Sequence, residues 1–245
     1  MRKIISGRRG GSEGFMMTID TRRVSPTGGN SGPLQFCFPI RTGTDANGAS
    51  VYPVNFEVDW GDGTTSFIDS TNFATNRLHN YPAQSNYTIT AKGSVAGFNF
   101  WNMQDLSASN LYDACKLISI EQWGDLIMTR GAPAGTGPQS GQCFRSCVNL
   151  STITATDIPT WGDDKASRAM FSQCANLSSI TNLNNWYMNG TIHPVFNYIP
   201  NLYSMFNGCT SLQYQGGSQN IDLSLWDVTN VSIMHRMFQN CDKFN

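Results

Sequence analysis

Charged side chains are scarce in this chain: they make up 13% of its 245 residues, whereas soluble domains average about 25%. No stretch of about 18 apolar residues occurs, so the sequence predicts no membrane-spanning helix. The formal net charge of −1 excludes a strong long-range attraction to nucleic acid or to an anionic membrane. Amides, hydroxyls and glycine take the place of charge, as is typical of β-rich proteins of virions and of the cell exterior.

Residue patterns for catalysis are missing as well. The three histidines, His79, His193 and His235, are scattered along the chain. No Gly-Lys-Ser/Thr phosphate loop, His-Glu-x-x-His helix or Gly-x-Ser-x-Gly turn occurs. Cys143 and Cys147 form an isolated pair, without the second pair of ligands that a zinc site needs. We therefore expect no enzyme, with no catalytic residue, no cofactor and no metal site.

The first 32 residues are basic and rich in Gly and Ser. Six basic side chains precede residue 24: Arg2, Lys3, Arg8, Arg9, Arg22 and Arg23. The apolar stretch Ile4-Ile5 is too short for a secretory signal. Either the export signal is not part of this sequence, or the protein is released by another route, as virus particles are. We interpret residues 1–32 as a flexible basic arm with one short extended segment at residues 15–19. It is either a free tail or an arm that docks on an acidic or symmetric partner.

Residues 34–95 carry the pattern of short β-strands. Apolar and polar residues alternate at residues 34–38, 54–60 and 87–90, and turn-forming clusters separate these runs. Short alternating strands between turns at this spacing are typical of a small antiparallel sandwich.

Three motifs in this segment resemble a PKD (polycystic kidney disease) domain. They are Val58-Asp59-Trp60-Gly61-Asp62-Gly63-Thr64-Thr65, His79-Asn80-Tyr81 and Asn86-Tyr87-Thr88-Ile89-Thr90, in the order of the family pattern. The resemblance covers residues 33–96 and implies an Ig-like sandwich. It also implies that Trp and Tyr fill the core, that the Asp-Gly turn and His organise loops, and that the domain serves as a spacer, an adhesion module or a virion decoration.

The acids around this turn leave two interpretations open. Asp59, Asp62 and Asp69 carry the carboxylate oxygens that calcium prefers. Asp and Gly also form tight turns without any metal. We expect simple turn formers, with calcium at Asp59 and Asp62 as the alternative.

A seven-residue motif occurs four times in the C-terminal part of the chain. Each copy has Phe, then Cys, then a large apolar residue at intervals of three: residues 144–150, 171–177, 206–212 and 238–244. A degenerate copy with Cys115 precedes them. The cysteines of the four copies are 27, 35 and 32 residues apart, as expected for stacked structural repeats. Such a stack offers an extended surface rather than a pocket, and its incomplete final copy predicts a continuation or a partner beyond Asn245.

The seven cysteines predict packing rather than disulfides. An odd number cannot all pair within one chain, and small buried Cys packs like an apolar residue. We expect mostly free thiols. We also expect Cys174→Ser or Cys209→Ser to lower the free energy of unfolding by roughly 1 to 3 kcal/mol, because a hydroxyl would be buried without a partner; thermal unfolding measures this.

The last copy and the residues before it resemble the BspA-like leucine-rich repeat of surface proteins. The segment Leu225-Trp226-Asp227-Val228-Thr229-Asn230-Val231-Ser232-Ile233-Met234-His235-Arg236-Met237-Phe238-Gln239-Asn240-Cys241 follows that family's pattern. Two upstream copies keep Met-Phe-x-x-Cys-x-x-Leu. The resemblance covers about residues 105–245 and implies adhesion and protein–protein contact.

Together these patterns predict a mainly β chain with short helices. We expect a flexible basic arm (residues 1–32), a PKD-like Ig-like β-sandwich (residues 33–96) and a BspA-like, leucine-rich-repeat-like solenoid (residues 97–245). The predicted function is non-enzymatic: a phage head decoration or tail appendage on the virion surface, present in multiple copies and bound to capsid or tail subunits. The alternative is a secreted bacterial adhesin of the cell surface that binds a host receptor protein or a glycan. An accessory module of a glycan-degrading enzyme is the third hypothesis.

Overall fold

The protein is mainly β-structure, as the sequence predicts. The computed structural model describes residues 13–24, 31–40, 54–100, 113–128, 141–161, 167–186, 201–213 and 221–244 without 222, 227, 229, 230 and 232. Helical structure in these ranges is short: α1 (Phe73–Asn76), η1 (Asp113–Lys116) and η3 (Leu183–Asn185). Within these ranges, no helix has the length and apolarity needed to cross a membrane.

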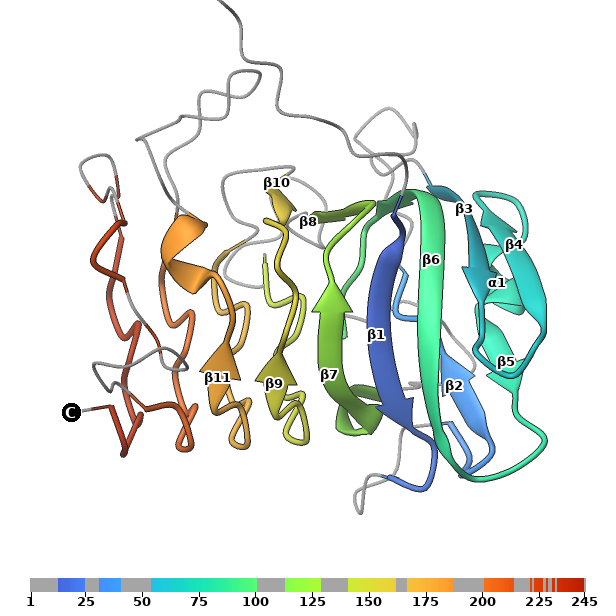
Figure 1. Ribbon diagram of the computed structural model, residues 1–245, viewed down its shortest axis with the longest axis horizontal. Coiled ribbons are helices and arrows are strands. Elements are labelled where there is room, and N and C mark those ends of the chain that lie inside the picture. Colours follow the sequence, from blue (N-terminus) through green and yellow to red (C-terminus); the bar gives the residue numbers. More distant parts are fainter. Residues whose placement is uncertain are drawn as a thin grey trace, which may run out of the picture.

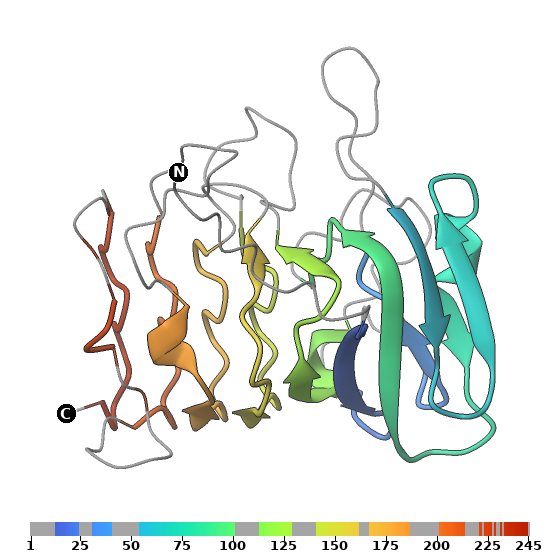
Figure 2. The same ribbon diagram turned by 45° about the horizontal axis from the view of Figure 1, so that its top comes forward.

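Most strands belong to one nine-stranded sheet, which runs along the molecule (Figures 1 and 2). Its strands are β1 (Phe15–Asp20), β3 (Val54–Asp59), β4 (Thr65–Asp69), β6 (Asn86–Ala96), β7 (Leu117–Gln122), β8 (Leu126–Met128), β9 (Thr152–Ile153), β10 (Thr160–Trp161) and β11 (Ser179–Ile180). The order is β10-β8-β6-β1-β7-β9-β11, and β3 pairs with β4 and β6. Strands β2 (Gln35–Cys37) and β5 (Leu78–Asn80) form a second, two-stranded sheet.

Strand β1 corrects the expectation of a flexible arm. The short extended segment expected at residues 15–19 is confirmed, but it lies in the middle of the sheet, antiparallel to both β6 and β7. Phe15, Met17 and Ile19 are fully buried, because alternate side chains of a strand point to the same face and here that face is the core. Residues 13–24 are therefore part of the fold. The basic residues before them lie outside the described residues.

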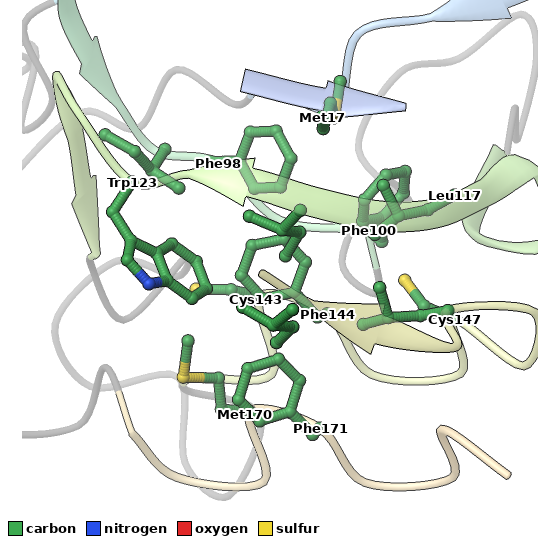
Figure 3. Packing of buried hydrophobic residues seen from close by; sticks show 14 of the residues in the cluster. Met17, Phe98, Phe100, Leu117, Trp123, Cys143, Phe144, Cys147, Met170 and Phe171 are labelled. Atoms are coloured by element: carbon green, nitrogen blue, oxygen red, sulfur yellow. The ribbon is translucent and has the colours of Figure 1, made fainter. Parts of the chain in front are cut away.

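The hydrophobic core continues across the boundary expected at residue 96. Phe98 packs its ring against Phe15 at a centroid distance of 5.2 Å and against Phe144 at 5.3 Å. Figure 3 shows Phe98 and Phe100 between Met17 of β1 and Phe144 of the first repeat copy. A single cluster of buried residues joins the two sides. The repeat copies thus extend from the N-terminal strands without a gap in the packing.

Candidate interaction surface

Consecutive copies of the seven-residue motif lie side by side and repeat the same contacts. In each copy the Phe N–H donates to the carbonyl of a Met in the next copy: Phe144 to Met170 at 3.0 Å, Phe171 to Met205 at 2.9 Å and Phe206 to Met237 at 2.9 Å. The Phe rings stack along the row at 5.6, 5.8 and 5.5 Å, with interplanar angles of 9–12°. The stacked rings account for Phe at this position, and the backbone bonds fix the spacing between copies.

From the second copy on, the cysteine of each copy is a hydrogen-bond donor to the copy before it. The Sγ of Cys174 donates to the Phe144 carbonyl and that of Cys209 to the Phe171 carbonyl, both at 3.1 Å. Cys241 makes the same bond, at 3.0 Å, to Phe206. All seven cysteines are free thiols, which confirms that prediction. Because the structure provides an acceptor, a serine here would not lack a partner. We expect the lower free energy of unfolding of the serine variants to come instead from the lost packing contacts of the larger sulfur atom and from the small void that serine leaves.

The register corrects the position of the degenerate copy. Ser119 pairs with Thr152, which aligns Leu117 with Leu150 and places the buried Ala114, rather than Cys115, opposite Cys147. Cys115 lies one residue out of the row and is half-buried. The shorter spacing between Cys115 and Leu117, two residues instead of three, is the sequence signal that distinguishes it.

We expect thiol reagents to distinguish Cys115 from the other cysteines. Burial raises the pKa of the Cys174 and Cys209 thiols well above the usual value, and the thiolate is the form that reacts. In native protein, Ellman's reagent should label Cys115 first, slowly because burial also raises its pKa. All seven thiols should react at once in denaturant. Rapid labelling of the buried thiols in native protein would contradict the stacked arrangement.

The turns around each Phe contain residues with left-handed backbone. One lies two positions before Phe and one two positions after it: Gln142 and Ser146, Ala169 and Gln173, Ser204 and Gly208, and Arg236 and Asn240. Seven of these eight residues carry a side chain, although positive φ costs an L-residue roughly 1 kcal/mol or more. The inter-copy hydrogen bonds therefore hold the backbone in a conformation that the residues themselves disfavour.

A substitution at Gly208 measures the free-energy cost of a positive φ at a residue that carries a side chain. A Cβ at Gly208 would come no closer than 3.6 Å to Gln173, so only its φ of 75° opposes substitution. We expect Gly208→Ala to lower the free energy of unfolding by about 1 kcal/mol and the melting temperature by about 2–4 °C. The exposed Asn176, substituted by Ala, is the control and should change stability by less than about 0.5 kcal/mol. An unchanged melting temperature for Gly208→Ala would show that the turn relaxes.

A row of hydroxyl side chains crosses the sheet. The pairing register places five residues opposite one another, which we call the hydroxyl row: Thr88 of β6, Thr18 of β1, Ser119 of β7, Thr152 of β9 and Ser179 of β11. Their strands lie side by side in Figure 1. Thr88 is exposed and the others are half-buried. At about 4.8 Å per strand the row is about 19 Å long. The row is an extended polar surface whose own side chains are uncharged, and the hydroxyl of Ser119 donates to the carboxylate of Glu121.

The turn that resembles a PKD domain is held by its own side chains. His79 stacks on Trp60 at 4.7 Å, and its Nε2 lies 2.8 Å from Asp62 Oδ2. Thr64 donates its N–H and its hydroxyl to Asp62 Oδ1. Burial raises the pKa of Asp62, but the hydrogen bonds from Thr64 and His79 outweigh it and leave the pKa below its usual value. Asp59 accepts the N–H of Gly61.

These contacts are relevant to calcium binding, which is the alternative role for Asp59 and Asp62. The carboxylates of Asp59 and Asp62 already accept hydrogen bonds that shape the turn, and Asp69 does the same for Thr71 and Asn72. Across the described ranges, no group of three or more His, Cys, Asp or Glu residues is placed to hold a metal ion. Turn formation is sufficient to explain these acids. Of the other histidines, His235 is exposed and His193 lies outside the described residues.

A buried ion pair escaped the sequence analysis. Lys116 Nζ lies 3.3 Å from Asp113 Oδ1, and both side chains are 0% exposed. Lys116 also donates to the carbonyls of Ser31, Gly32 and Gln35. Asp113 accepts from the Ser31 hydroxyl and from the N–H of Cys37. This network fastens residues 31–37 to η1. Only the position of Lys116 directly before an apolar strand hinted at it.

The repeats of this chain match a known family. Residues 142–245 match the model of a family described as "Mycoplasma protein of unknown function, DUF285". No curated protein and no solved structure matches the chain. The matched range contains the four copies of the motif and covers less than half of the chain. The chain is thus similar to this family in its stacked repeats.

Proposed function

We propose that this chain is a non-enzymatic structural and adhesion protein that makes extended contacts through its sheet face. The observation that carries the proposal is the hydroxyl row, which spans both the N-terminal strands and the repeats. Hydroxyls donate and accept hydrogen bonds, so such a row suits contact with a polar surface. The thiols and rings of the motif are used for stacking, which leaves the exposed polar positions for a partner.

In the proposed architecture, residues 33–96 are an Ig-like module of PKD type and residues 97–245 a leucine-rich-repeat-like solenoid of BspA type. The virion setting is the first candidate, with capsid or tail subunits as partners and many copies per particle. The bacterial cell surface is the second. The family match over the repeats favours it, because that family is described from Mycoplasma.

Substitutions on the sheet face test the contact. Ser179→Arg places a long charged side chain in the hydroxyl row, whereas Asn176→Arg places the same side chain at an exposed bend of the same copy. We expect Ser179→Arg to abolish retention of the chain on its particle or cell, and Asn176→Arg to leave retention unchanged. Equal retention of both variants would exclude the row as the contact.

Electron microscopy separates the two settings. Gold-labelled antibody to the chain on purified phage particles should give a regular, stoichiometric pattern if the protein is a virion component. Labelling of intact bacterial cells without particle labelling would favour the adhesin. Hydrolysis of a glycan by the pure chain, lost on a single substitution, would overturn the non-enzymatic function itself.

A further inference from the structure

Around the Phe of each motif copy, the backbone hydrogen bonds between copies point in one direction. In each interface, three N–H groups of one copy donate to carbonyl groups of the next copy, at N···O distances of 2.6–3.0 Å. The donors are residues 142, 144 and 146 of the first copy, 169, 171 and 173 of the second, and 204, 206 and 208 of the third. Around its Phe, each copy therefore presents backbone donors to the copy that follows it.

The last copy presents the same three donors without acceptors. They are the N–H groups of Arg236, Phe238 and Asn240, and in the part of the chain that the structure describes no acceptor bonds to them. Arg236 and Asn240 are exposed and Phe238 is half-buried, so solvent reaches this edge. Met234 is 46% exposed, whereas Leu202, at the same position of the copy before, is 0% exposed. The last copy lies at one end of the row of copies (Figures 1 and 2).

The edge at the opposite end of the molecule is protected. Strand β4 lies there and pairs only with β3. The carbonyl of Phe67 accepts a hydrogen bond from Asn76 Nδ2, and the N–H of Asp69 donates to Asn72 Oδ1, both at 2.9 Å. Proteins commonly cover a sheet edge in this way, because unpaired backbone groups invite pairing with another chain. Among the described residues, the last copy lacks such side-chain cover for its three donors.

The unpaired groups define the kind of partner. Three aligned N–H groups require a backbone that offers three carbonyls. A second molecule cannot supply them from the same edge, because its donors would face these donors. The ring of Phe244 already stacks on Phe238 at 4.2 Å, so the partner needs no aromatic residue there. Ile233 and Met234 are exposed apolar side chains of this copy and favour apolar side chains on the partner.

We propose that the outer edge of the last copy binds an extended segment of a partner protein, which adds to the stack as a further copy would. Carbonyls of alternate residues of that segment accept the N–H groups of Arg236, Phe238 and Asn240, and its apolar side chains cover Met234. The three interfaces between copies show the same pairing inside the chain. The edge is separate from the hydroxyl row, so either proposal can fail without the other.

A peptide with the sequence of residues 201–213 is the probe for this edge. Inside the chain, its carbonyls at residues 203, 205 and 207 accept the N–H groups of the second copy, so it carries the acceptors that the last copy needs. In ¹H–¹⁵N spectra of the full chain, we expect the peptide to move the backbone N–H signals of Arg236, Phe238 and Asn240 downfield in a saturable titration. A peptide with the same residues in scrambled order should not move them.

Met234→Arg should weaken the peptide at least about tenfold, because it places a charged side chain where apolar contact is expected. Val148→Arg is the matched control: Val148 is an apolar side chain of the first copy that is 41% exposed, and the affinity should not change. The proposal is overturned if the three signals do not move, if the scrambled peptide moves them equally, or if Met234→Arg binds as well as the unmodified chain. Self-association of the free chain that Met234→Arg abolishes and Val148→Arg preserves would identify a second copy as the occupant, and would equally overturn it.

Discussion

Lys116→Met should lower the free energy of unfolding by roughly 3–5 kcal/mol, the usual cost of removing one partner of a buried ion pair. The substitution leaves the Asp113 carboxylate charged in a site that is 0% exposed. It also removes the donor from the carbonyls of Ser31, Gly32 and Gln35, and a buried acceptor that loses its donor is costly in itself. Urea unfolding followed by circular dichroism measures the change in midpoint.

Lys92→Met is the matched control for this experiment. Lys92 is an exposed residue of β6, so the same loss of charge should change stability by less than about 0.5 kcal/mol. A change below about 1 kcal/mol for Lys116→Met would contradict the proposed role of the network in fastening residues 31–37 to η1.

Alkaline pH should destabilise this protein strongly. Burial raises the pKa of Cys37 to about 12 and those of Cys147, Cys174 and Cys209 well above the ordinary value of 9.0. Above about pH 9 the unfolded chain releases thiol protons that the folded chain keeps. The contribution of these thiols to the free energy of unfolding is therefore fully present below that pH and is lost as the pH rises. Above the pKa of the unfolded thiol, each of these thiols lowers the free energy of unfolding by about 1.4 kcal/mol per pH unit.

Lys116 changes the stability of the protein with pH in the opposite direction to the thiols. Burial lowers its pKa from 10.5, so just below that pH the unfolded chain binds more protons at this residue and stability rises with pH. From about pH 8 to about pH 10 the four thiols together should lower the free energy of unfolding by about 5 kcal/mol, and Lys116 offsets part of this loss. Urea midpoints measured in the presence of a reductant give this value. Cys174→Ala should reduce the pH dependence of the urea midpoint by the contribution of one thiol. A pH-independent midpoint would show that the thiols are accessible to solvent in the folded chain.

The local part of the fold was predictable from the sequence. Alternation located β3 and the first part of β6, because a half-buried strand has a period of two residues. Repetition located the stacked copies and the free thiols, because equivalent positions in a stack share one environment. The structure adds the thiol-to-carbonyl bonds, which depend on the distance between copies and leave no separate trace in the sequence.

The non-local part was not predictable. The segment of β1 stands among glycine and arginine residues, and its place between β6 and β7 depends on partners distant in the chain. Lys116 was missed because lysine is almost never fully buried without a partner, and its partner Ser31 belongs to the segment that resembled an arm. The hydroxyl row exists only once the register between strands is fixed, since each single strand contributes one ordinary Ser or Thr residue.

The central position of β1 has a consequence for the time course of folding. Thr18 bonds to Thr88, 70 residues away, and β1 also pairs with β7, which is synthesised later still. Pairings between distant segments form slowly, because a long loop must close first. During synthesis, β1 is therefore made before either of its partner strands, whereas each repeat copy contacts mainly the copies next to it in the sequence. β1 therefore reaches its final place in the sheet only after β6 and β7 have been synthesised.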